Sequence, residues 1–206
     1  MKKLRVLLPF FIFTSSAYAA CPLSIPGAEC GPATRYDVSV ASVALCTEAT
    51  CASPVTVGSG ARVFDIASAA VGSAVGSYAN MDNLSAGSYT HVQTTVSRTF
   101  TVTGAAIIAA GVGANCPAQT AQALSVPNNN PGGLDALMAA AGITWADPPA
   151  KTQLKIITAL GSPLTLSKTS LAPSVSVKFG TQKGLMCIGV DSFPSPPDVN
   201  VSVAVN

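Results

Sequence analysis

The sequence predicts an all-β protein with one short helix, and three observations support this fold class. The segment Leu84–Gly104 alternates polar and apolar residues, which is the period of a strand with one buried face. About nine segments with strand character follow one another at short spacing, separated by glycine and proline, as in a β-sandwich. Only Leu134–Ala141 has the composition of a helix, so the pattern does not support an α/β fold.

The first 19 residues have the layout of a signal peptide. A basic start is followed by the apolar run Val6–Phe13 and by the small residues Ala17-Tyr18-Ala19. The run is too short to span a bilayer, and no other segment reaches the roughly 18 apolar residues of a membrane helix. The start resembles bacterial signal peptides. We therefore expect an exported protein, extracellular or on the cell surface, or alternatively periplasmic, with one mature domain, 20–206.

Removal of this segment changes the net charge. Loss of Lys2, Lys3 and Arg5 leaves eight basic residues against nine acidic ones, so the mature chain is near −1 rather than +2. No basic surface for nucleic acid or anionic lipid is expected. Hydrophobic residues make up 49% of the chain and charged residues 10%, which argues against disorder. Such sparse charge does little to oppose self-association.

Six cysteines in an exported chain predict disulfides, although six thiols allow fifteen pairings. Proximity in the sequence favours three pairs: Cys21–Cys30, Cys46–Cys51 and Cys116–Cys187. A metal site at Cys46 and Cys51 is a competing interpretation, but the sequence has a single histidine and export favours oxidation. Cys21 has a second alternative as a lipid anchor, because the residues before it are similar to a lipoprotein cleavage box.

The first clear strand is Tyr36–Cys46. Its apolar residues alternate as Val38 and Val40 and then change phase to Val43 and Leu45. A change of phase of this kind predicts a β-bulge, which we place at Ala41-Ser42. The flanking segments are expected to be an irregular stretch at 21–34, an edge strand at 54–57, a turn at 58–60, a strand at 61–66 and a loop at 67–83.

The alternating segment from Tyr89 to Val102 is long for one strand. We expect it either to bend at Ser97-Arg98 or to cross from one sheet to another. Arg98 lies among the apolar positions, and burial of an unpaired guanidinium is costly. We therefore expect a bulge there, a carboxylate partner such as Asp65, or a solvated strand end.

The second half of the chain begins with a long loop, about 113–150, that contains the short helix Leu134–Ala141 with Gly142 as its C-cap. The helix is about two turns long and needs packing to be stable, so we expect it to cover one end of a sheet. Further strand candidates are 152–160, 164–166, 174–179 and 183–190. A proline-rich stretch then precedes a strictly alternating terminal strand, 199–205.

The residues Leu84-Ser85-Ala86-Gly87-Ser88-Tyr89 form an L-x-x-G-x-Y pattern. Glycine can adopt the positive φ of a turn, and tyrosine offers apolar area with a polar tip. The pattern resembles the turn-into-strand signature of prealbumin-like and Cna-B-like immunoglobulin-type domains. The resemblance implies an immunoglobulin-like β-sandwich of the adhesin and surface-protein kind, and no functional residue is carried over from it.

No motif for catalysis or cofactor binding is present. His91 lies on the polar side of its strand, and no serine stands in a G-x-S-x-G turn. The sequence has neither a phosphate-binding loop nor a dinucleotide fingerprint. We therefore expect no enzymatic activity, no catalytic residue, no cofactor and no metal.

Two functions of different classes fit these expectations. The first is a secreted structural or adhesive surface protein that assembles with itself or with another surface subunit, as in a pilus-like filament. The stiff segment 194–197 would present the terminal strand to an open sheet edge of a neighbour. The residues of this assembly strand are Val199, Val201, Val203 and Val205. In the rival arrangement, the same strand pairs within its own domain.

The second function is a monomeric periplasmic or secreted ligand-binding module. The loops 67–83 and 113–150 would then lie together at one end of the sandwich and form a pocket. Trp145 and Met138 would line that pocket.

Overall fold

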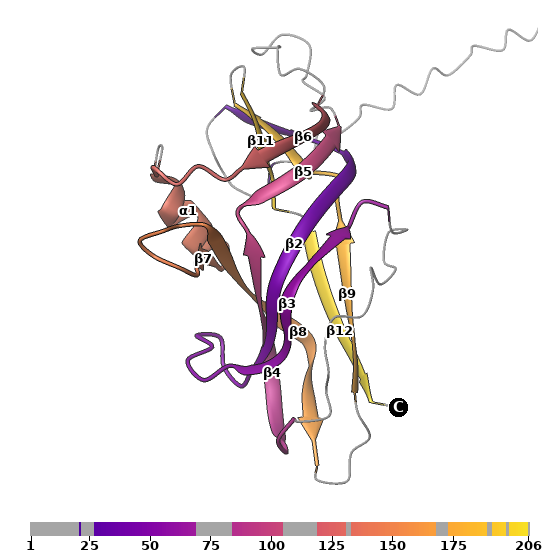
Figure 1. The fold of residues 1–206 in the computed structure, drawn as a ribbon. Helices are drawn as coiled ribbons and strands as arrows, with labels where there is room; N and C mark the ends of the chain where they lie inside the picture. Colours follow the sequence, from indigo (N-terminus) through magenta and orange to yellow (C-terminus); the bar gives the residue numbers. More distant parts are fainter. Residues whose placement is uncertain are drawn as a thin grey trace, which may run out of the picture.

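The computed structural model describes residues 21, 27–68, 84–104, 119–130, 133–167, 173–188, 191–196 and 198–205. These residues form antiparallel sheets and one short helix (Figure 1), so the all-β prediction is confirmed. The elements are β1 (Ala28–Gly31), β2 (Ala33–Cys46), β3 (Val55–Asp65), β4 (Gly87–Ser97), β5 (Thr99–Gly104), β6 (Gln119–Ser125), α1 (Leu134–Ala140), β7 (Ile143–Trp145), β8 (Gln153–Leu166), β9 (Pro173–Gly180), β10 (Leu185–Ile188), β11 (Asp191–Pro194) and β12 (Asp198–Val205).

Strand β2 is the centre of the largest sheet. One edge of β2 pairs with β3, and the other edge pairs first with β5 and then with β4. The far edges of β4 and β5 pair with β8 and β6, and β7 pairs with β8. A second sheet has the order β1–β10–β11, and a third consists of β9 and β12 alone. Figure 1 shows α1 and β7 on one side of the molecule and β9 and β12 on the other.

The predicted bulge in β2 is confirmed at Ala41. Val40 is opposite Val96 and Ser42 is opposite Thr95, so β2 contains one more residue than β4 over this interval. Because successive side chains of a strand point to opposite faces, the extra residue returns the later apolar positions to the face of the earlier ones. Val40 and Leu45 are both buried as a result.

The predicted bend at Arg98 is also confirmed, and the chain does not change sheets there, because β4 and β5 both pair with β2. The Arg98 amide donates to the Thr152 carbonyl (3.1 Å), and its carbonyl accepts from the Val126 amide (3.0 Å). The guanidinium donates to the Val126 carbonyl (3.0 Å) instead of reaching Asp65. Arg98 therefore links Val126, the residue directly after β6, to Thr152, the residue directly before β8.

The apolar face of the sheet carries two clusters of buried residues. One contains Tyr36, Phe100 and Val102, with the two aromatic rings 5.4 Å apart between centroids. Helix α1 adds Leu134 and Met138 to this cluster, which is the covering role expected for it. The second cluster contains the following residues: Leu45, Val57, Tyr89, Val92, Leu160, Leu164 and Leu166.

Two glycines that the sequence placed at turns differ in their backbone φ angle. Gly142, directly after the C-cap of α1, has φ 74° and ends the helix as predicted. Gly87, by contrast, begins β4 and does not have a positive φ.

Several predicted loops contain strands. The stretch 58–60 was expected to be a turn, but it lies inside the single strand β3, where Gly60 has φ 92° at a change of register opposite the bulge of β2. The loop expected at 113–150 contains β6 and β7, and the irregular stretch 21–34 contains β1. These short strands have weak alternation, and their partners lie far away in the sequence.

The burial of Leu45 gives a test of this core. Leu45 is fully buried, whereas Val63 on the neighbouring strand β3 is 67% exposed. We expect Leu45→Ala to lower the free energy of unfolding by about 2–5 kcal/mol, through lost burial and a residual cavity. Val63→Ala, the control, should change it by less than about 0.5 kcal/mol. Urea denaturation measures both values, and similar losses for the two variants would contradict the assigned core.

Candidate functional site

The first candidate residues are the cysteines. Two of the three predicted pairs are present, Cys21–Cys30 and Cys46–Cys51, with Cα–Cα distances of 5.3 and 5.1 Å. Cys46 and Cys51 therefore form a disulfide instead of a metal site. Disulfides of this kind indicate an oxidising compartment, extracellular or periplasmic. Cys187 is buried, but Cys116 lies outside the described residues, so the third pairing stays a prediction.

Other functional signals are weak. Within the described parts of the chain, no three His, Cys, Asp or Glu side chains gather closely enough to hold a metal ion. No helix there is long and apolar enough to cross a membrane. The segment expected to be a signal peptide, 1–19, lies outside the described residues.

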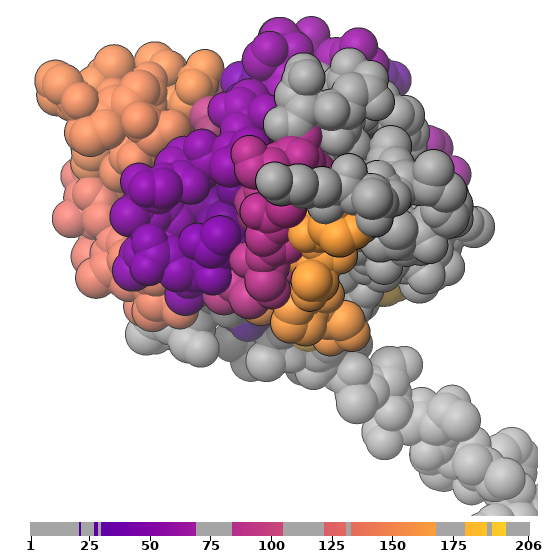
Figure 2. Space-filling view, turned by 90° about the horizontal axis from the view of Figure 1, so that it is seen from below, coloured from indigo at the N-terminus to yellow at the C-terminus, as the bar shows by residue number. Residues whose placement is uncertain are grey.

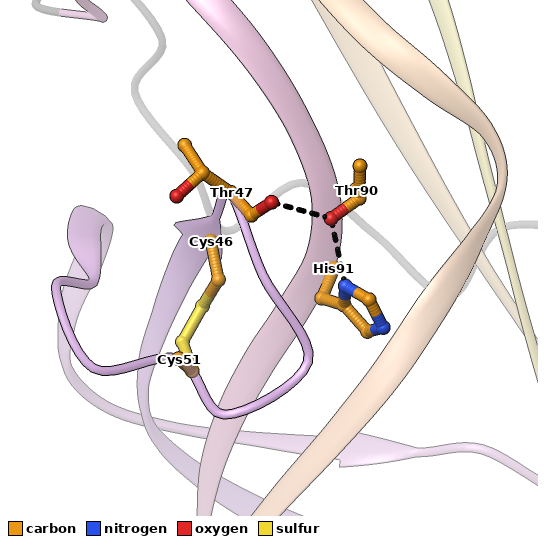
Figure 3. Close-up of a disulfide and its surroundings, with 5 residues drawn as sticks. All are labelled: Cys46, Thr47, Cys51, Thr90 and His91. Carbon is orange, nitrogen blue, oxygen red and sulfur yellow. Dashed lines mark hydrogen bonds between the residues drawn. A yellow bond between two sulfur atoms is a disulfide. The ribbon is translucent and has the colours of Figure 1, made fainter.

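His91 lies beside the second disulfide and its loop (Figure 3). The Thr90 hydroxyl donates to the Thr47 carbonyl (2.9 Å) and is 2.8 Å from His91 Nδ1. The ring tautomer decides which atom donates in this second contact. The bond from Thr90 to Thr47 attaches the loop after β2 to β4, and the His91 ring contacts the hydroxyl that makes this bond.

The predicted assembly strand is β12, and in this chain it pairs with β9. All eight residues of β12 have antiparallel partners, from Asp198 opposite Gly180 to Val205 opposite Pro173. The four valines Val199, Val201, Val203 and Val205 are opposite Phe179, Val177, Val175 and Pro173. The pair lies near β8, but its backbone partners are each other. Within one chain, the rival arrangement is therefore the one observed.

The segment before β12 was predicted to be a stiff linker, but it is anchored in the fold. Pro194 ends β11, and Pro194 and Ser195 are both buried. The Ser195 amide donates to the Gly184 carbonyl (3.0 Å), and the Tyr36 hydroxyl donates to the Ser195 carbonyl (3.0 Å). The Ser195 hydroxyl is 3.6 Å from Cys30 Sγ, and it is the donor because a disulfide sulfur has no proton.

Tyr36 is the residue that connects this segment to the main sheet. Its ring is in the first core cluster and its side chain is 1% exposed. Burial raises the pKa of the phenol far above its usual value, so the hydroxyl stays protonated and remains a donor. Sequence reasoning missed both Tyr36 and Ser195, because their contact joins positions 159 residues apart.

A second polar cluster lies at the end of the molecule formed by α1, β7 and β8. Asp135 accepts from Trp145 Nε1 and from Lys151 Nζ, both at 2.8 Å. The Lys151 ammonium is also 5.3 Å from the centroid of the Trp145 ring. Asn130 Oδ1 accepts from the Asp135 amide (2.7 Å) at the start of the helix. The cluster holds α1 against the β7–β8 hairpin.

The loop between β7 and β8 is fixed by Asp147. Its carboxylate accepts from the amides of Thr152 and Gln153 at 2.9–3.1 Å and from the Thr152 hydroxyl. In Figures 1 and 2 this loop projects from one corner of the molecule. Pro148, Pro149 and Ala150 are exposed there.

The pocket residues predicted for a binding module have other contacts. Met138 is 2% exposed in the core, and Trp145 is half-buried with its ring nitrogen bound to Asp135. Most of the predicted loop 67–83 lies outside the described residues, so the pocket stays a prediction. No family model, curated protein or solved structure matches this chain. The resemblance at Leu84–Tyr89 therefore also stays a prediction.

The polar cluster predicts an acid titration. Lys151 and then Trp145 lower the pKa of Asp135, and the Thr152 hydroxyl lowers that of Asp147, from an ordinary 3.8. A lowered folded pKa means that the stabilising ionised form is fully present above 3.8 and is lost only as pH falls through the lower value. We expect the fluorescence of Trp145, the single tryptophan, to stay constant down to pH 3.8 and to change below it.

Two variants show which carboxylate causes this change in fluorescence. Asp135→Asn removes the charge that binds Lys151, so most of the change should disappear, whereas Asp147→Asn should retain it. A fluorescence midpoint at or above pH 3.8 in the native protein would contradict the cluster.

Proposed function

We propose that this protein is an exported structural protein of the cell surface, adhesive or filament-forming, whose copies join by β-strand addition. The C-terminal strand β12 of one copy would pair with β9 of the next. Its partners are therefore other copies of the chain or a similar surface subunit, and it has no enzymatic role.

One observation carries this proposal. β9 and β12 form a sheet of their own, separate from the sheet organised by β2. All eight backbone pairs of β12 are made to β9, so the β9 of an identical neighbour offers the same set of partners. Exchange of β12 between copies would replace one set of hydrogen bonds by an equal set, and it would leave the pairing of β2, β4 and β8 unchanged.

Three further features support an exported surface protein. Disulfides fit an oxidising compartment. The sparse charge does little to oppose contact between copies. Tyr89 is buried, and its hydroxyl donates to the Ser85 carbonyl (3.0 Å). A strand-start tyrosine that bonds to backbone a few residues upstream also occurs in immunoglobulin-type sandwiches, which supports the proposal of that architecture.

Truncation tests the proposal. We expect the full mature chain, concentrated after purification, to form ordered fibres in electron microscopy. A chain that lacks residues 198–206 should remain as dispersed particles, because it has no strand to donate. Removal of Asn206 alone is the control, since it leaves all of β12 in place, and it should leave the fibres unchanged.

A synthetic peptide of residues 198–206 completes the test. It should bind the truncated chain at β9 and raise its melting temperature without producing fibres. Unchanged fibres from the truncated chain would contradict strand addition. Dispersed particles from the full chain under all assembly conditions would favour the monomeric binding module.

A further inference from the structure

The geometry points to a fixed boundary within the C-terminal segment: only residues 198–205 exchange, whereas β10, β11 and Ser195 stay with their own domain. This inference rests on the proposed function, since it specifies which part of the chain a second copy receives. The boundary follows from a difference in how the two parts of the segment are attached. The described residues between 181 and 195, which are 181–188 and 191–195, contain the contacts to the main sheet and to β1, and residues 198–205 pair with β9.

The β10–β11 hairpin belongs to the core of its own chain. β10 pairs with β1 at four positions, from Ala28 opposite Ile188 to Gly31 opposite Leu185. Leu185, Met186 and Cys187 are 0%, 4% and 3% exposed, and the disulfide Cys21–Cys30 ties β1 to the preceding chain. Exchange of this hairpin would require three core side chains to leave their own domain and pass through water before they are buried again.

The turn before β10 is equally constrained. The Ala33 amide donates to the Thr181 carbonyl (2.9 Å). Gly184 lies so close to the main sheet that a Cβ there would be 3.0 Å from both Ala33 Cβ and Tyr36 Cδ2. A contact this close, beside the buried Tyr36, means that a larger residue at 184 would require these neighbouring side chains to shift by a few tenths of an ångström. The turn is therefore packed directly on β2.

Ser195 is the last residue attached in this way. Its amide bonds to Gly184, its carbonyl accepts from the Tyr36 hydroxyl, and its hydroxyl meets Cys30 Sγ. The residue is completely buried, so these bonds are shielded from water. Tyr36 acts here as a positioning residue, because it connects Ser195 to the central strand of the main sheet.

The two residues immediately after Ser195 cannot donate backbone hydrogen bonds. Residues 196 and 197 are both proline, and proline has no N–H with which to bond the domain. Two residues separate Ser195 from Asp198, and the three Cα–Cα steps between these two positions span at most about 11 Å when extended. The β9 that receives the exchanged strand must therefore lie within that reach of the donor's Ser195. Where each copy donates to the next, the joint is head-to-tail and produces an open filament unless its rotation closes a ring, whereas reciprocal donation between two copies closes a dimer.

Two engineered cysteine pairs locate the exchange boundary. Val177→Cys with Val201→Cys joins Cα partners in β9 and β12, and Ala28→Cys with Ile188→Cys joins partners in β1 and β10. Directly opposite residues of antiparallel strands lie within disulfide range. Chains labelled with ¹⁵N are mixed with unlabelled chains, assembled and oxidised, and the cross-linked peptides are mapped by mass spectrometry. Mixed-isotope peptides identify links between copies, and native disulfides are distinguished by their sequences.

We expect mixed-isotope peptides for the 177–201 pair and single-isotope peptides for the 28–188 pair. The reverse result would mean that the whole segment 173–205 moves as one unit, which overturns this inference but leaves assembly by exchange intact. Single-isotope peptides for both pairs in assembled material would overturn the proposed strand addition itself. Ser176→Cys with Ser202→Cys reports on the same joint if the valine pair impairs folding.

Tyr36→Phe tests the positioning role. This change keeps the ring and removes only the hydroxyl that bonds Ser195. We expect a measurable fraction of the 28–188 links to become mixed-isotope in the Tyr36→Phe background, while the 177–201 links stay mixed. Phe100→Leu, a change in the same core cluster away from Ser195, should lower stability without moving the boundary. No change in the 28–188 links with Tyr36→Phe would contradict this role for the hydroxyl.

Discussion

The structure depends on one constraint: β2 must keep the apolar residues from Tyr36 to Leu45 on one face while it pairs with β3 on one edge and with β5 and β4 on the other. Ala41 adds one residue to β2 opposite β4. The bend at Arg98 adds two residues to the β4–β5 side, since the three steps from Val40 to Asp37 correspond to five from Val96 to Thr101. The extra residue at Ala41 and the two extra residues at the Arg98 bend keep the apolar side chains on the buried face. A shift of one residue without compensation would turn the face outward.

This continuous face determines where the rest of the chain can attach. Tyr36 on β2 lies under the turn at Gly184 and bonds Ser195, so the C-terminal segment meets the main sheet at the first core cluster. β9 and β12 pair with each other and form a separate two-stranded sheet. The fold therefore contains a strongly held part, organised by β2, and a two-stranded sheet whose hydrogen bonds are made within itself. A two-stranded sheet is only marginally stable alone, which makes it the suitable element for exchange.

Local sequence features predicted the bulge at Ala41, the bend at Arg98, the end of α1 at Gly142 and two disulfides between near neighbours. They did not predict β6 or β7, because short strands with weak alternation are defined by partners elsewhere in the chain. They also placed a turn at Gly58–Gly60, where the register shift opposite Ala41 requires a flexible strand residue instead. The contacts of Ser195 with Tyr36 and of Asp135 with Lys151 join distant positions, and no local pattern indicates them.

Amide hydrogen exchange of the native monomer tests the central claim most directly, since it measures how independently each sheet opens. If β9 and β12 are separable, their amides exchange through a local opening while those of β2, β4 and β10 keep full protection. In that case, mild denaturant accelerates exchange in the main sheet and has little effect on the β9–β12 pair. Equal protection in all these strands, with the same denaturant dependence, would show that β12 opens only when the whole domain unfolds, and would contradict the account.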